Sequence, residues 1–184
     1  IVHTGDTNTA IRFPAADTFT VETSGSEAFR VDSSGRLLLG TTTTTNNIRL
    51  GNKFGVVGTA AYTGMSISQY AGTTAAEKPM IDFNRSRGTS DGSLTSVANN
   101  DGLGEIVFRG ADGTDFNDAA TIRAFVDGTP SDGTDMPGRL TFSTSPDGSA
   151  TPTERVTIDA GGDVTFKGAS SDGKWDRSAD AFVA

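Results

Sequence analysis

The densest group of oxygen ligands in the sequence consists of Asp112, Asp115, Asn117 and Asp118. Carboxylate and amide oxygens from one short loop are the ligands that Ca²⁺ collects, roughly six to eight at a time. The spacing departs from the EF-hand pattern, which needs Gly at its sixth position and Glu at its twelfth. The same side chains also cap the amides of tight turns. Both interpretations stay open; we favour turn capping and predict no metal site.

Three further residues are candidates for catalysis, two carboxylates and one imidazole. Asp82 and Glu105 each lie beside an apolar residue of an alternating run, and paired carboxylates are the groups with which glycosidases cleave sugars. Polar residues that alternate with apolar ones on a strand face solvent, and nothing in the spacing brings these two carboxylates into one cleft. His3, the sole histidine, has no orienting partner in the sequence. We therefore predict that the protein is not an enzyme and binds no cofactor.

Three amphipathic aromatic residues are able to stack on sugars or to anchor a protein contact: Tyr62, Tyr70 and Trp175. For Trp175, packing at a junction between repeats is the favoured interpretation. For the two tyrosines, which flank a Gly-rich stretch, we favour core filling over a binding loop. No residue is assigned to receptor binding.

The composition excludes several classes of protein. The net charge is −8, and the basic residues form no stripe, so nucleic acid is not an expected partner. No apolar run approaches the roughly 20 residues of a membrane-spanning helix, and membrane insertion is not expected either. The chain has no Cys, which removes disulfides and thiolate metal sites. It begins with Ile1 rather than Met, and we interpret it as a fragment of a longer protein.

Apolar residues recur as pairs separated by one residue, as in Leu140/Phe142 and Val164/Phe166. A period of two places both members of a pair on one face of a β-strand, with polar neighbours on the other. Most of these runs are short, with turn residues between them. The pattern predicts an all-β protein of short strands.

Seven Asp-Gly pairs punctuate the runs, and Asp-Gly suits the positive φ angles of a type I′ hairpin turn. One stretch competes with the all-β interpretation, because residues 117–125 also fit a short capped helix. The alternation of Ile122, Ala124 and Val126 favours a strand there.

A gapless internal repeat relates residues 27–39 to residues 154–166. Both follow the formula E-x-h-x-h-D-x-x-G-x-h-x-h, in which h is apolar, and the formula predicts a strand, a turn and a strand. The Asp side chain is expected to cap turn amides, and the Gly to supply the positive φ that closes the turn. A second echo, Gly-x-apolar-x-Phe, begins at Gly104 and Gly138, and residues 79–83 look like a degenerate copy of it. Repeated strand–turn units are typical of stacked, elongated architectures.

The repeats and the breaks between them predict four segments. Residues 1–40 form a first β repeat module, and residues 41–78 form a Thr- and Gly-rich linker with a variable part. Residues 79–168 form a second β module, and residues 169–184 begin a further repeat.

The apolar residues are too sparse for one chain to bury a two-layered core. Leu, Ile, Val and Phe make up about one residue in five, at the margin for independent folding. Three copies around a common axis would share one core and would pair their exposed strand edges. We therefore predict an elongated homotrimeric fibre segment. Its core residues are expected to be Phe29, Val31, Leu37, Leu39, Ile81, Phe83, Ile106, Phe108, Leu140, Phe142, Val156, Ile158, Val164 and Phe166.

The stretches from Ile1 to Gly40 and from Gly104 to Phe166 closely resemble segments that recur in tail fibres and related appendage proteins of tailed bacteriophages, cyanophages among them. The stretch from Gly173 to the end is similar to the start of a further repeat, in which W-D-[KR]-S precedes a strand. The resemblance implies shaft-type modules of intertwined β-structure in a homotrimer. The self-cleaving chaperone domain that ends some members of the family has no match in this sequence.

By this resemblance, the chain is expected to be a structural component of a phage tail fibre, a shaft that presents host-recognition elements. The expected partners are further copies of the chain, other tail or capsid proteins of the virion, and a glycan or protein of the host surface. The expected location is the virion, outside the host cell. Two alternatives stay open: an adhesion module that itself binds carbohydrate or a receptor, and a fibre or decoration protein of the capsid head.

Overall fold

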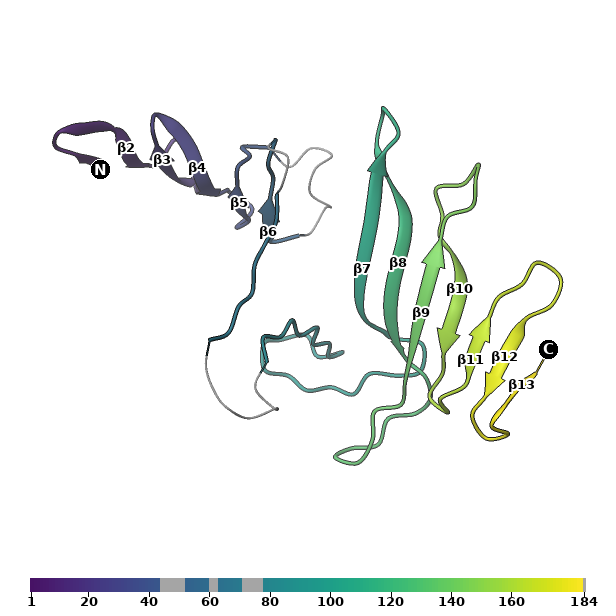
Figure 1. Cartoon of the computed structure of the whole chain (residues 1–184). Helices are drawn as coiled ribbons and strands as arrows, with labels where there is room; N and C mark the ends of the chain where they lie inside the picture. Colours follow the sequence, from purple (N-terminus) through teal and green to yellow (C-terminus); the bar gives the residue numbers. More distant parts are fainter. Residues whose placement is uncertain (44–51, 60–62, 71–77, 184) are drawn as a thin grey trace. The chain divides into compact units, whose positions relative to one another are not determined.

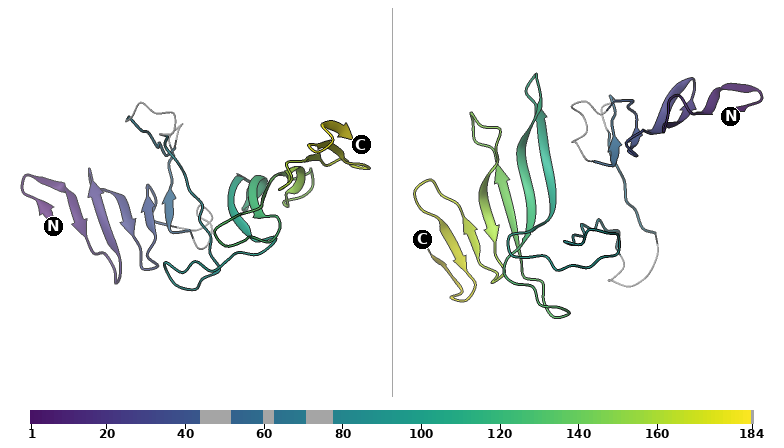
Figure 2. Two further views of the ribbon diagram at one scale, coloured as in Figure 1. Left: turned by 90° about the horizontal axis from the view of Figure 1, so that it is seen from below. Right: turned by 180° about the vertical axis from the view of Figure 1, so that it is seen from behind.

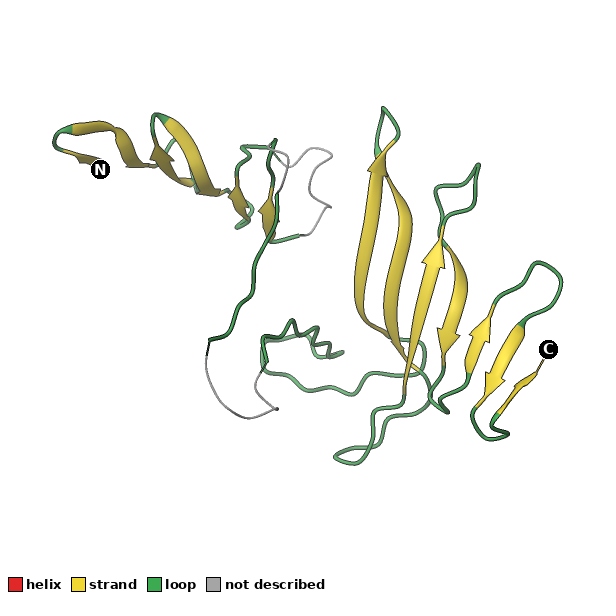
Figure 3. Cartoon of the chain, in the orientation of Figure 1, coloured by secondary structure: helices red, strands yellow, loops and turns green. Residues whose placement is uncertain are grey.

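The computed structural model of the chain describes residues 1–43, 52–59, 63–70 and 78–183. The predicted role of Tyr62 lies outside these ranges, and so does a further alternating apolar pair of the sequence, Ile48 and Leu50, which is also expected to lie on a strand. The chain divides into two compact units, Ile1–Met80 and Ile81–Ala184, and each is described by itself. Strands and turns, but no helix, make up the described residues (Figure 3), and the all-β prediction is confirmed. No segment of these residues is a helix able to span a membrane.

The first unit contains a six-stranded sheet whose strands follow one another in chain order (Figure 1). They are β1 (Val2–His3), β2 (Asp6–Arg12), β3 (Phe19–Thr23), β4 (Ser26–Val31), β5 (Leu37–Leu39) and β6 (Phe54–Val56). The first five form an antiparallel meander, whereas β6 pairs with β5 in parallel. Because β6 lies in the segment expected to be a linker, that segment contributes a strand to the sheet.

The second unit contains a seven-stranded antiparallel meander, again in chain order. Its strands are β7 (Gly102–Ala111), β8 (Phe116–Val126), β9 (Gly138–Thr144), β10 (Thr153–Ile158), β11 (Val164–Phe166), β12 (Gly173–Asp176) and β13 (Ala181–Val183). The last two strands come from the segment expected to begin a further repeat, and they extend this same sheet.

Two local expectations are decided by this sheet. Residues 117–125 belong to β8, where Ile122 lies opposite Ile106 on one side and Phe142 on the other, so a strand and not a helix forms there. The expectation that residues 79–83 copy a strand motif is wrong, because residues 78–101 carry no strand. That segment precedes the edge strand β7 and makes no ladder with it.

The internal repeat produces the same turn twice, as its formula predicts. Asp32 Oδ1 accepts hydrogen bonds from the amides of Ser34 (2.9 Å) and Arg36 (3.0 Å). In the second copy, Asp159 Oδ1 accepts from the amides two and four residues further on, at 2.9 and 3.0 Å. The closing glycines, Gly35 and Gly162, have φ angles of 68° and 89°. Aspartate capping and a left-handed glycine therefore build this turn in both sheets.

The prediction that the Asp-Gly pairs form type I′ turns is wrong. The glycines of most of these pairs do have positive φ, but none of their aspartates does, and a type I′ turn needs both. The turn with two consecutive positive φ angles is Ser24–Gly25 (53° and 74°), which joins β3 directly to β4. The Asp-Gly tips are longer: the amide of Asp112, for example, donates to the carbonyl of Asp115 across a four-residue tip.

Within each unit the strands form a single layer, and the described residues add no second sheet to it (Figure 2). Thr20, Leu38, Thr121 and Thr141 are each at most 3% exposed, and all four lie on the faces that carry the charged residues. Arg30, for example, lies in register between Thr20 and Leu38, and the long stem of an arginine side chain is able to cover such neighbours.

Candidate interaction surface

The face of the second sheet opposite the arginines carries continuous rows of apolar side chains, because residues in register across antiparallel strands share a face. One row runs Ile106, Ile122, Phe142, Val156 and Phe166. A second row runs Gly104, Ala124, Leu140, Ile158, Val164, Trp175 and Phe182. With Phe108, which follows Ile106 on the same face, these residues are called the apolar band below. None of them is charged.

The apolar band is left substantially exposed by its own chain. Its seven most exposed large side chains keep between 37% and 63% of their surface, and they are Ile106, Phe108, Phe142, Ile158, Phe166, Trp175 and Phe182. At roughly 80–100 Å² each, they expose on the order of 600 Å² before the half-buried members are added. Soluble monomers rarely show contiguous apolar patches of this size. The area approaches the roughly 800 Å² that each partner contributes to a stable interface.

The opposite face of the same sheet is polar and internally paired. Its central row runs Glu105, Arg123, Thr141, Thr157, Thr165 and Lys174. Arg123 forms an ion pair with Glu105 at one end of the row, and Lys174 lies 2.5 Å from Asp163 at the other. The Lys174 ammonium and the amide of Arg177 hold the pKa of Asp163 below its ordinary value. This face is suited to water, and the band behind it is suited to a protein partner.

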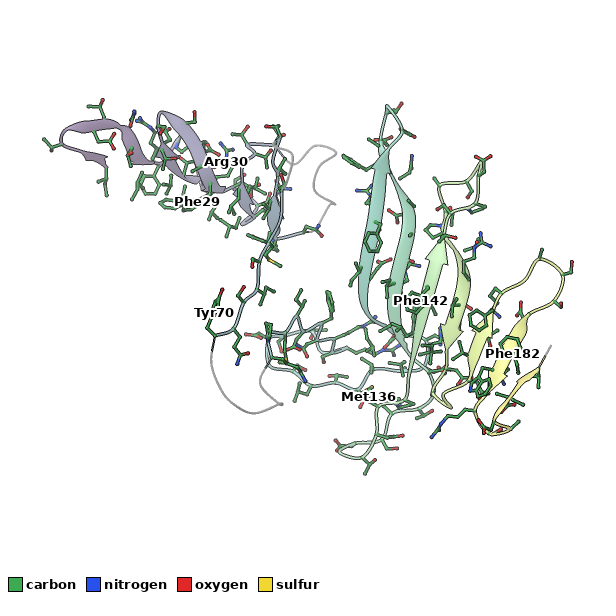
Figure 4. The ribbon with its side chains drawn as sticks, in the orientation of Figure 1. Phe29, Arg30, Tyr70, Met136, Phe142 and Phe182 are labelled. Atoms are coloured by element: carbon green, nitrogen blue, oxygen red, sulfur yellow. The ribbon has the colours of Figure 1, made fainter. Side chains whose placement is uncertain are left out.

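The first sheet has the same two-faced construction. Its apolar rows are Ile11, Val21, Phe29, Leu39 and Val56, beside Phe19, Val31, Leu37 and Phe54. Phe54 and Val56 keep 48% and 40% of their surface. Arg30, the neighbour of Phe29 in β4, lies on the other face (Figure 4), where it forms a two-point ion pair with Glu27 at 2.6 and 2.7 Å.

Twelve of the fourteen residues expected in the core lie on these apolar faces, whose function as a core stays a prediction. The other two, Ile81 and Phe83, lie in the non-strand segment that precedes β7. Five members of the band are absent from the expected set: Gly104, Ile122, Ala124, Trp175 and Phe182. The strands of Trp175 and Phe182 hold only one large apolar residue each on that face, so no alternating pair marks them; Trp175 lies opposite both Val164 and Phe182.

The oxygen-rich cluster of residues 112–118 is committed to the tip of the β7–β8 hairpin. Asp112 Oδ1 accepts from the amides of Thr114 and Asp115, both at 2.8 Å, and its Oδ2 accepts from Asn117 Nδ2 at 2.6 Å. These donors, the two amides first, lower the pKa of Asp112. Asp118 pairs instead with Arg109 at 3.1 Å. Asp112 therefore caps the turn with the support of Asn117, Asp118 forms an ion pair, and the described residues contain no cluster of acidic groups arranged around a metal.

The structure brings the candidate carboxylates Asp82 and Glu105 to the lining of one shallow hollow beside β7, which their spacing in the sequence does not predict. Glu105 is ion-paired there with Arg123. Tyr70 is 98% exposed in a segment without strands, so its expected role in core filling is wrong for the chain alone. Trp175 packs in the band, in keeping with the packing role expected of it. His3 belongs to the short edge strand β1.

Asp101 ties the non-strand segment to the start of β7. It is buried, and its carboxylate accepts hydrogen bonds from Arg87 Nε (2.6 Å) and Nη2 (2.9 Å) and from the amide of Ala98 (2.9 Å). Arg85 approaches it at 3.3 Å and donates to the carbonyl of Gly102 at 2.8 Å. Arg87 first, then the Ala98 amide, hold the pKa of Asp101 far below its ordinary value.

Replacing Asp101 by Asn is expected to loosen residues 84–101. Because the pKa of Asp101 is depressed by folding, its contribution to stability is complete above its unfolded pKa of about 4 and is lost as the pH falls below that value. We expect Asp101→Asn to lower Tm by a few degrees at pH 7, and the difference from the parent to shrink at pH 3. Asp91→Asn, at an exposed position of the same segment, is the control. A pH-independent difference would contradict the assigned role of the carboxylate.

The fold is similar to that of a bacteriophage tail-fibre domain, which confirms the tail-fibre resemblance predicted from the sequence. One similar solved structure is the carboxy-terminal domain of the bacteriophage T5 L-shaped tail fibre with its intra-molecular chaperone domain. The TM-score is 0.69 at 15% identity, over 91% of this chain and 52% of that one. The chain therefore spans about half the length of that structure.

A second structure, of the carboxy-terminal domain of the same T5 fibre, matches with a TM-score of 0.61 at 15% identity, over 91% of this chain and 75% of the other. No protein-family model and no curated protein matches the chain. The likeness is therefore one of fold.

Proposed function

We propose that this chain is a structural, non-enzymatic segment of a phage tail fibre, in which three copies pack their apolar faces around a common axis. The observation that carries the proposal is that each sheet has one uncovered apolar face and one polar face with its own ion pairs. As a monomer in solution, the chain would expose about 600 Å² of the apolar band to water. Three copies would remove that surface from water together.

The proposed role is mechanical: the trimer forms a shaft segment that holds host-recognition elements away from the virion. Turn tips such as residues 112–115 carry exposed Asp and Thr side chains, and the net charge of −8 keeps such a shaft soluble. Polar side chains of the described residues, such as Asp32, Asp112 and Asp159, cap turns. Polar groups used in this way stabilise the chain's own fold, which supports a structural role for the protein.

Electron microscopy of virions labelled with gold-tagged antibody against the chain tests the proposed location. We expect the label on fibres attached to the tail. Label on the capsid head would overturn the tail assignment and favour a head fibre or decoration protein. The assembly of three chains is tested by a separate measurement.

A further inference from the structure

The second row of the apolar band is incomplete at its β7 end. The row begins with Gly104, which has no side chain, and Ala124, which has a methyl group, before the larger Leu140. The sheet is therefore hollowed there. A volume of about 360 Å³ remains there between the sheet and the side chains of Ile81 and Phe83, and most of the residues that line it are apolar.

Phe83 forms one wall of this hollow and lies over Gly104 from outside the sheet. A Cβ atom added to Gly104 would lie 2.7 Å from Phe83 Cβ and 2.8 Å from Phe83 Cγ, so the Phe83 side chain rests directly on the backbone of β7. Ile81 lines the same hollow. The hydrogen bond from Arg85 Nη1 to the carbonyl of Gly102 fixes the contact, two residues away along each segment. A non-strand segment thus supplies the side chains that the row lacks.

These two residues are anchored on one side and open on the other. Ile81 and Phe83 keep 63% and 55% of their surface, although both lie against the sheet. The tether through Arg85, Arg87 and Asp101 holds them in place without help from a second layer. They therefore continue the apolar band to its β7 end and offer an exposed apolar side of their own.

The length and width of the apolar band indicate which surface packs against its β7 end in the proposed trimer. Seven strands about 4.8 Å apart make it long, while its rows, about 7 Å apart along each strand, make it narrow. Three narrow bands bury one another most completely when their long directions follow one axis, which brings the β7 ends of the three chains together. Without Phe83, the three glycines would leave an unfilled space inside that core, and apolar voids are destabilising.

We propose that Ile81 and Phe83 form a plug that closes the β7 end of the shared core, with their exposed sides packed on the apolar band of a second copy of this chain. The inference rests on the proposed trimer and adds its partner contact. It also explains why Gly104 stands in β7: any side chain there would displace Phe83.

The test compares the trimer dissociation constants of Phe83→Ala and Leu94→Ala with that of the parent, by sedimentation equilibrium of the full chain. Leu94 is the matched control, since it is a large apolar residue of the same segment and is 94% exposed. We expect Phe83→Ala to raise the dissociation constant at least about ten-fold, as interface anchors do, and Leu94→Ala to change it less than about two-fold.

Gly104→Ala keeps the inference testable if Phe83→Ala fails to fold. Its added methyl group would collide with Phe83 at 2.7 Å and push the plug out, so the dissociation constant should rise as well. A parent-like constant in a folded variant of either residue, or an equal rise for Leu94→Ala, would overturn the plug. A parent chain that sediments as a monomer would instead overturn the proposed trimer itself.

Discussion

Phe142→Asp is expected to abolish assembly, so that the variant sediments with the 19.0 kDa mass of one chain and loses cooperative melting. Phe142 lies at the middle of the apolar band, between Ile122 and Val156. In the proposed trimer the change directs three carboxylates into one core, where desolvation costs several kcal/mol for each ion unless it takes up a proton. Phe108→Asp should act in the same way from the edge of the band.

The matched control for this charge is Thr165→Asp. Thr165 lies on the polar face of β11, opposite Lys174 in register, so that the new carboxylate gains a cross-strand cation and stays in contact with water. We expect this variant to assemble as the parent does. An intact trimer with parental Tm for Phe142→Asp would refute the assignment of the apolar band to the core.

Gly162→Ala adds only one methyl group, but it is expected to lower the stability of the protein strongly. Gly162 closes the repeated turn with a φ of 89°, a conformation that costs a residue with a Cβ atom about 1–2 kcal/mol. Since three chains melt as one unit in the proposed trimer, the loss amounts to roughly 3–6 kcal/mol per trimer. The measurement is Tm by calorimetry. A Cβ at this position would also meet Arg177 Cδ at 2.6 Å, a contact that the flexible Arg177 side chain relieves and that Ala and Asn share. Gly162→Asn should therefore lose less than Gly162→Ala, because Asn tolerates the left-handed region.

The neighbouring Gly161 provides the control for this turn. Gly161 is also a glycine of this turn, but its φ lies outside the positive range. An added Cβ would meet Asp159 Oδ1 at 3.2 Å, a contact that a small side-chain movement relieves. Gly161→Ala is expected to stay within about 0.5 kcal/mol of the parent. Equal losses for the two alanine variants would show that the φ angle does not control the stability of the turn.

The apolar faces could be predicted from the sequence because the spacing of residues within a single strand determines them. The two-residue period of Leu140 and Phe142 states which face of β9 is apolar without any knowledge of its neighbours. The repeated turn was predictable for the same reason, since Asp159 and Gly162 act within five residues. The Asp-Gly pairs misled because the dipeptide indicates a positive φ at Gly, whereas the length of the tip decides the turn type.

The remaining features depend on contacts between residues that are distant in sequence. Ile81 and Phe83 alternate as strand residues do, but the bonds of Arg85 and Asp101 direct their segment elsewhere. β6 pairs with β5 in parallel, and local patterns do not predict such a pairing. Phe182 joins the band by leaning over Gly173 to stack on Phe166, with ring centroids 6.1 Å apart. Side-chain period alone does not reveal that contact.

Sedimentation equilibrium of the unmodified chain at micromolar concentration tests the central claim, that uncovered apolar faces bring three copies together. The result that we predict is a single species with three times the 19.0 kDa chain mass, folded by circular dichroism. A folded monomer under the same conditions would contradict the account, because the apolar band would then be stable in water without a partner.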